Sequence, residues 1–191
     1  MQIITWLVAA MFAWAPARDT ERARYTEIAS DLAAVTFDES EVPLFAGASG
    51  RSQTALLLAS VAAHESTFRK DVEDGRARGD SGSSWCFMQL HVGAGKTVDG
   101  WTGKELAADR KKCFRAGLHN ARESFRMCNA QPLIEKLGAY ASGSCGKSAE
   151  SRQMVTRAMS YFKRTPVTDD SFLHIEKSTP WLVDTTAKQT D

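Results

Sequence analysis

Glu65 is the residue whose type and position point most directly to chemistry. It follows an apolar run, residues 55–63, which as a helix would be apolar on all sides and therefore buried. Burial disfavours an ionised carboxylate, and so does the negative end of the helix dipole. Both effects favour a carboxylic acid that keeps its proton near neutral pH, as a general acid must. On position alone, a structural Glu bonded to the backbone or to an Arg is an equally good interpretation.

Three short motifs follow one another along the chain: Glu65-Ser66, Phe87-Met88-Gln89 and Ala139-Tyr140-Ala141-Ser142-Gly143. In this order they resemble the lytic transglycosylase family (SLT-type) of the lysozyme-like superfamily, which is related to goose-type lysozymes. Residues 106–117 and 151–161 resemble two further helices of that family, again in order. Cys86 and Phe87 stand where the family has Gly-Leu, so the turn before Met88 must form without that glycine. The resemblance covers roughly residues 50 to 165.

The resemblance implies cleavage of the β-1,4 bond between N-acetylmuramic acid and N-acetylglucosamine in peptidoglycan glycan strands, the expected partner. Glu65 would be the catalytic acid and then the base, while the muramoyl 6-hydroxyl closes a 1,6-anhydro ring. Neither a second carboxylate, a cofactor nor a metal is then required. Ser66, Met88, Gln89 and Tyr140 would bind or orient the substrate. Core packing is the alternative role for Met88 and Tyr140.

Two other functions fit the same residues. A hydrolytic muramidase of the goose-type lysozyme kind would need a carboxylate that activates water, and Asp71, Asp74 and Asp80 lie in the polar stretch after Glu65. Acidic residues on such loops are usually only solvated. The third function is a non-catalytic, glycan-binding or structural protein of a virion or secretion apparatus that keeps the fold.

Length and composition indicate one soluble domain. The chain has 191 residues, 43% hydrophobic and 25% charged, which suits one compact core and a monomer. A net charge of +1 gives no electrostatic case for binding nucleic acid.

Four cysteines permit two disulfides with three connectivities. Cys113 and Cys128 lie at either end of one predicted helix, about 22 Å apart and too far for a bridge. Of the remaining connectivities we favour Cys86–Cys113 with Cys128–Cys145, because each pair links neighbouring elements. Two bridges would indicate an oxidising, extracytoplasmic compartment, periplasmic, secreted or virion-associated. A zinc site is disfavoured because the sequence has no Cys-x-x-Cys pair. The alternative to two disulfides is that the cysteines are free buried thiols.

The chain divides into four segments. Residues 1–17 are an apolar N-terminal segment, either a signal peptide or a packed helix, and are too short to span a membrane comfortably. Residues 18–50 are expected to form a helix and a linker, and residues 51–165 the catalytic domain. The tail, residues 166–191, has little periodicity and is expected to wrap the surface or to be mobile.

The expected fold class is mainly α, a lysozyme-like α+β fold with a small β or irregular element beside the active-site cleft. Apolar residues at helical spacing predict a helix with Tyr25, Ile28, Leu32 and Val35 on its inner face. One further helix is expected to start at Pro132 and to carry Tyr140. A short strand is predicted within residues 87–92.

Helix starts are predicted from capping residues. We expect Asp19 or Thr20, Ser52, Asp109 and Ser148 to cap one helix each, and a capping box at Thr102-x-x-Glu105.

Overall fold

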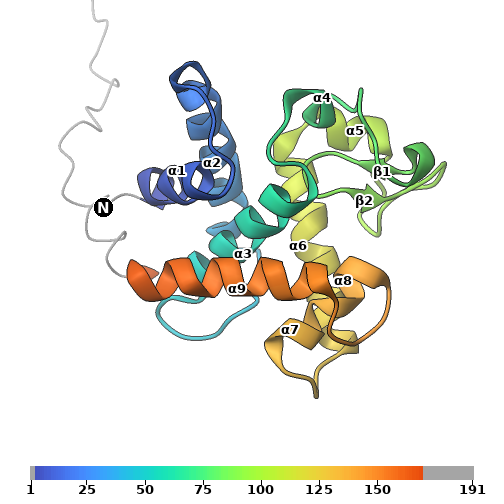
Figure 1. Ribbon diagram of the computed structural model, residues 1–191. Coiled ribbons are helices and arrows are strands. Elements are labelled where there is room, and N and C mark those ends of the chain that lie inside the picture. The colour runs from blue at the N-terminus through green and yellow to red at the C-terminus, as the bar shows by residue number, and fades with distance from the viewer. Residues whose placement is uncertain (1–2, 170–191) are drawn as a thin grey trace, which may run out of the picture.

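The structure is a computed structural model that describes residues 3–169. Its described part is mainly helical with one small antiparallel sheet, which confirms the predicted fold class (Figure 1). The elements, in chain order, are α1 (Ile3–Trp14), η1 (Asp19–Glu21), α2 (Arg22–Thr36), α3 (Gly50–Glu65), α4 (Lys70–Glu73), η2 (Asp80–Gly82), β1 (Ser84–Trp85), β2 (Leu90–His91), α5 (Gly103–Ala108), α6 (Arg110–Met127), α7 (Leu133–Lys136), α8 (Gly138–Ser142) and α9 (Ala149–Arg164).

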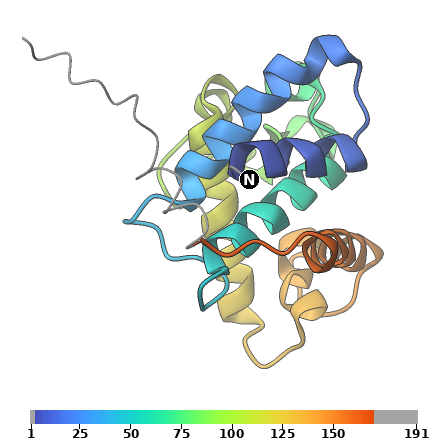
Figure 2. The same ribbon diagram turned by 90° about the vertical axis from the view of Figure 1, so that its left-hand side faces the viewer.

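Helix α3 is the centre of the fold. It packs against α1, α2, α6 and α9, and every residue from Thr54 to Ala63 is buried. Figures 1 and 2 show α3 crossing the middle of the molecule, with α9 packed across it at an angle. The Ser60 hydroxyl, which lies in this apolar setting, donates to the carbonyl of Met154 at 2.8 Å. The prediction that the helix leading to Glu65 is buried on all sides is therefore confirmed.

The start of α3 differs from the prediction. The helix begins at Gly50, so Ser52 lies inside it and is not its N-cap. The carboxylate of Asp169 accepts hydrogen bonds from the backbone N–H groups of Arg51 and Ser52, each at 3.0 Å. It also accepts from the Ser52 hydroxyl. A carboxylate from beyond the end of α9 thus serves as the cap, because negative charge is favoured at a helix N-terminus.

Three of the other predicted caps are confirmed and one is wrong. Thr102 and Glu105 form the capping box of α5, Asp109 caps α6, and Ser148 caps α9. Residues 19–21 instead form the 3-10 helix η1, and α2 starts at Arg22 without a side-chain cap. The predicted inner face of α2 is buried, as expected.

The helix expected after Pro132 is interrupted. It forms two short helices, α7 and α8, that meet at Leu137, and Tyr140 lies on the second. Gly138 approaches the backbone of Gly146 so closely that a Cβ there would lie 2.2 Å from the Gly146 carbonyl oxygen. This contact with the segment before α9 has no local signature in the sequence.

The predicted strand is shorter than expected. Leu90 and His91 pair with Trp85 and Ser84, whereas residues 86–89 form the turn of this hairpin. Cys86 and Gln89 in that turn have φ angles of 58° and 44°. Two non-glycine residues therefore adopt the left-handed conformation, which is uncommon without a constraint.

Both disulfides have the predicted connectivity. Cys86–Cys113 joins the hairpin turn to the first turn of α6, and Cys128–Cys145 joins the end of α6 to the segment before α9. All four cysteines are bonded in this way.

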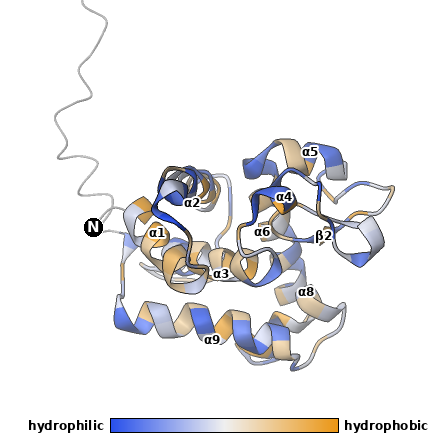
Figure 3. Cartoon of the chain, turned by 45° about the horizontal axis from the view of Figure 1, so that its top comes forward, coloured by the Kyte–Doolittle hydropathy of each residue, from blue (hydrophilic) through white to orange (hydrophobic). Residues whose placement is uncertain are grey.

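The N-terminal segment is a packed helix in the structure. Helix α1 lies against α2 and α3, with Trp6, Leu7 and Met11 buried. Figure 3 shows α1 and α3 side by side, with mainly apolar colouring along both. Within residues 3–169, none of the helices is long and apolar enough to cross a membrane. The prediction for the C-terminal tail falls largely on residues 170–191, outside the described residues.

Candidate active site

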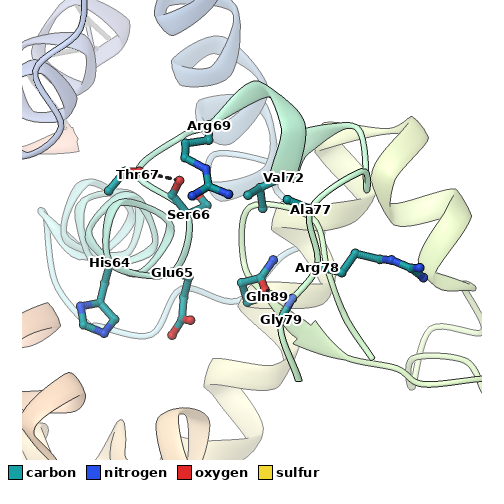
Figure 4. Close-up of a pocket in the computed structure, with 10 residues that line it drawn as sticks. All are labelled: His64, Glu65, Ser66, Thr67, Arg69, Val72, Ala77, Arg78, Gly79 and Gln89. Atoms are coloured by element: carbon teal, nitrogen blue, oxygen red, sulfur yellow. Dashed lines mark hydrogen bonds between the residues drawn. The ribbon is translucent and has the colours of Figure 1, made fainter. Parts of the chain in front are cut away.

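A hollow of about 370 Å³ lies beside the C-terminal end of α3. One wall is formed by the end of α3 and the turn that follows it, through residues 64–67 and Arg69. The opposite wall is formed by residues 77–79 and by Gln89 from the hairpin turn. Figure 4 shows the carboxyl group of Glu65 on the first side and Gly79 with Gln89 across from it. The volume of this hollow is in the range of sites that bind small molecules.

Glu65 occupies this hollow with a perturbed carboxyl group. Burial, together with the smaller effect of the negative charges of Asp80 and Glu150, raises its pKa from 4.5 to about 7. Within residues 3–169, its carboxyl group accepts no hydrogen bond and forms no ion pair. The alternative of a structural Glu bonded to the backbone or to an Arg therefore lacks the partner it requires. The carboxyl group has the properties of a general acid near neutral pH.

Ser66 holds the turn that ends α3. Its hydroxyl donates to the carbonyl of Ala62 at 2.7 Å and accepts from the backbone N–H of Phe68 at 3.2 Å. Thr67 and Phe68 follow with φ angles of 47° and 54°. The Phe68 ring is fully buried and contacts the ring of Tyr25, which anchors this strained turn in the core. Both partners of the Ser66 hydroxyl belong to the protein, so its contribution is to the position of Glu65.

Gln89 bridges the two halves of the opposite wall. Its side-chain carbonyl accepts from the backbone N–H of Gly79 at 2.9 Å, and its NH₂ group donates to the carbonyl of Cys86 at 3.0 Å. A Cβ on Gly79 would lie 2.6 Å from the Gln89 oxygen, so only glycine allows this contact. Gln89 lines the hollow as predicted, although its amide is already engaged on both sides.

Met88 lies in the core and not in the lining of the hollow. Its side chain is fully buried and packs on Gly117 of α6, where a Cβ would lie 2.7 Å from the terminal methyl carbon. Its carbonyl accepts from the Tyr140 hydroxyl at 2.8 Å. Burial raises the pKa of Tyr140 well above its ordinary value, and the charge of Glu65 acts in the same direction. Tyr140 therefore braces the hairpin turn close to Glu65 and directs its hydroxyl at Met88.

The three acidic candidates of the loop separate into two groups. Asp71 pairs with Arg69 at 3.1 Å, and Asp74 pairs with Arg76 at 3.0 Å and with Lys70. Asp80 accepts from the hydroxyl of Ser84, and within the described residues it lies 3.8 Å from the Nδ1 of His91 rather than beside an Arg or Lys. Its charge acts on Glu65. Asp80 is thus the candidate that the fold brings into electrostatic contact with Glu65.

Sequence analysis did not identify three charged groups near Glu65, namely Glu150, Arg69 and Arg78. The charge of Glu150, in the first turn of α9, raises the pKa of Glu65. The pKa of Glu150 itself is lowered, mainly by hydrogen bonds to its own backbone and to Ser148 and less strongly by the charge of His64. Acidic residues are common in the first turn of helices because the helix dipole favours negative charge there, so the position of Glu150 in the sequence did not indicate a functional site. Arg69 and Arg78 also line the hollow.

No group of three or more His, Cys, Asp or Glu side chains within residues 3–169 is arranged to hold a metal ion. None of the known protein families, curated proteins or solved structures compared with this chain matches it. The chemistry of the hollow is therefore inferred from its own residues: a largely desolvated, unpaired carboxyl group opposite a wall that hydrogen bonds hold rigid.

Proposed function

We propose that this protein is a lytic transglycosylase that cleaves the glycan strands of peptidoglycan, with Glu65 as general acid and base. The observation that carries the proposal is the unpaired Glu65 carboxyl group in an open hollow, with its pKa raised to about 7 mainly by burial. A carboxylic acid that is half protonated near neutral pH can donate its proton to a leaving oxygen and accept one afterwards. The ordered motifs of the sequence support the same reaction class.

In the proposed reaction, Glu65 protonates the oxygen of the β-1,4 bond as the bond from C1 of the muramoyl residue to that oxygen breaks. The substrate's own N-acetyl group stabilises the positive charge that develops at C1. Glu65, now ionised, takes the proton of the muramoyl 6-hydroxyl while that oxygen bonds to C1. The products are a 1,6-anhydromuramoyl end and a new free 4-hydroxyl, and Glu65 regains its proton.

The other site residues would position Glu65 and shape the hollow. Ser66 and the buried Phe68 hold the turn after the catalytic residue. Gln89 and Tyr140 hold the hairpin turn that forms the opposite wall, through bonds to Gly79 and Met88. Such positioning matters because displacement of a catalytic group by about 1 Å costs roughly two orders of magnitude in rate.

A hydrolytic muramidase is the second candidate, and the charge of Asp80 that acts on Glu65 favours it. In an inverting hydrolase, a second carboxylate activates water across the sugar from the acid. Asp80 would have this role. Asp71 and Asp74 are already paired with cationic side chains.

Digestion of purified peptidoglycan sacculi followed by mass spectrometry tests both candidates. We expect anhydromuropeptides from the wild type, none from Glu65→Gln, and nearly full activity from Asp80→Asn. Reducing-end muramic acid as the sole product, lost in Asp80→Asn, would identify the hydrolase instead. If wild type and Glu65→Gln release equally little product at every pH, the protein is not an enzyme of this kind and the non-catalytic function is the correct one.

We further propose an extracytoplasmic location, where peptidoglycan lies. It is supported by the two disulfides, which persist in oxidising compartments.

A further inference from the structure

A second hollow lies next to that of Glu65. It has a volume of about 690 Å³, nearly twice that of the first, and the two share Thr67 and Arg69 in their walls. Its opposite wall comes from the connection between α1 and α2, including Trp14, and from the start of α2. Its lining includes residues from the loop joining α1 to α2 and the loop joining α3 to α4, whose courses can be followed in Figure 1.

The wall between the two hollows is the strained turn after Glu65. Thr67 has a φ of 47°, although it is β-branched, and the next residue is also left-handed. Side chains of this kind rarely adopt such a conformation. Strain of this sort is typical of ligand-binding and catalytic segments. The turn presents Thr67 and Arg69 to both hollows, so one ligand can contact both.

The charged side chains in the lining of the second hollow are mainly cationic. The lining contains Arg24, Arg69, Lys70 and Arg76, against two acidic side chains, Glu21 and Asp71. Arg24 is held by Glu21 and Glu73, with side-chain exposure of only 16%.

The other three cations are more than half exposed and pair with Asp71 or Asp74. Exposed pairs of this type contribute at most about 1 kcal/mol each, so an incoming carboxylate can displace the acidic partner at little cost.

Trp14 adds an apolar surface to this cationic lining. Its indole is partly buried and packs edge-on against the ring of Tyr161, with ring centroids 5.6 Å apart. A fixed aromatic ring beside exposed cations suits a ligand with apolar side-chain atoms and several carboxylates.

We propose that this second hollow binds the acidic stem peptide of peptidoglycan. The proposal rests on the proposed function of the Glu65 site, because the stem peptide branches from the muramoyl residue whose C1 is attacked. A peptide that branches there would extend beside the catalytic hollow, and the second hollow, with four cationic side chains in its lining, adjoins it there. The N-terminal helices, which lie outside the motif-bearing residues 50 to 165, would thus contribute to substrate recognition.

Binding of a soluble stem peptide tests the subsite independently of catalysis. The probe is the tripeptide L-alanyl-γ-D-glutamyl-diaminopimelate, titrated into the full chain while the indole N–H signals are followed by NMR. Trp14→Phe assigns the Trp14 signal. We expect the tripeptide to shift that signal. The double variant Lys70→Glu with Arg76→Glu should bind the tripeptide about tenfold more weakly or worse, because negative side chains then face the carboxylates of the tripeptide. Lys104→Glu, an exposed charge reversal on α5 that lines neither hollow, should leave binding unchanged.

Activity provides the second measurement. On strands that carry stem peptides, the charge-reversed double variant should show a raised KM and an unchanged kcat. On strands stripped of peptides by an amidase, it should match the wild type. Three results would each refute the stem-peptide subsite. They are a Trp14 signal that the tripeptide does not shift, equal tripeptide binding by the wild type and the double variant, and a Trp14 signal that a chitooligosaccharide shifts instead. Absence of any glycan cleavage by the wild type would refute the proposed function alone, since tripeptide binding is measured without turnover.

Discussion

Replacing Glu65 with Gln should change how the stability of this protein depends on pH. In the folded protein, burial and, to a smaller extent, the charges of Asp80 and Glu150 raise the pKa of Glu65 from 4.5 to about 7. Below pH 4.5 the carboxyl group is protonated in both the folded and the unfolded chain. Between pH 4.5 and 7 the unfolded chain releases this proton while the folded protein keeps it, so the free energy of unfolding falls as the pH rises. Above pH 7 both states are ionised and the loss is complete.

The magnitude follows from the separation of the two pKa values. That separation corresponds to about 3 kcal/mol, and because the side chain keeps some contact with water we expect about 2 to 3 kcal/mol. Gln has nearly the same shape and does not titrate. The free energy of unfolding of the wild type minus that of Glu65→Gln should therefore be highest at pH 4 and lower by this amount at pH 8.

Urea denaturation followed by circular dichroism, at constant ionic strength and at pH values from 4 to 8, measures this difference. Glu39→Gln, which removes an exposed carboxylate from the linker before α3, is the matched control and should give a nearly constant difference. In the same pH series, glycan cleavage by the wild type should decline above about pH 7, since the general acid is then ionised. A wild-type minus Glu65→Gln difference that stays constant from pH 4 to 8 would refute the reasoning about burial and, with it, the role of Glu65 as the acid.

Four further changes test the parts of the fold that support the site. Replacing both Cys86 and Cys113 with Ser should lower the free energy of unfolding by about 3–4 kcal/mol and also reduce glycan cleavage. Replacing Cys128 and Cys145 should cost similar stability but little activity, as urea denaturation and product analysis can show. Gly103→Ala should lower the melting temperature, because its Cβ would lie 2.3 Å from the Trp85 ring, and such overpacking costs about 1–3 kcal/mol. Asp169→Ala should cost about 0.5–2 kcal/mol in urea denaturation through loss of the α3 cap, and an unchanged midpoint would contradict that role.

Local patterns were sufficient for much of the fold. The apolar run before Glu65 predicted a fully buried helix, since a helix without a polar face has no side to offer to water. The capping box at Thr102 and the caps at Asp109 and Ser148 were predicted because both partners of each bond lie within three residues. The length of α6 excluded one disulfide connectivity, and the favoured one is present.

Contacts between distant parts of the chain decided the rest. Asp169 replaced Ser52 as the N-terminal partner of α3, because the end of α9 returns to that helix.

The chemistry of the site depends on such contacts as well. The loop of residues 71–84 offered three equivalent acidic candidates, and only the folded chain separates Asp80, which acts on Glu65, from the paired Asp71 and Asp74. The sequence by itself thus determined which carboxyl group is buried at a helix end, since burial of a uniformly apolar helix is a local property. The tertiary structure decided which groups surround that carboxyl group, because hydrogen bonds and charges act through space between residues that no local pattern relates.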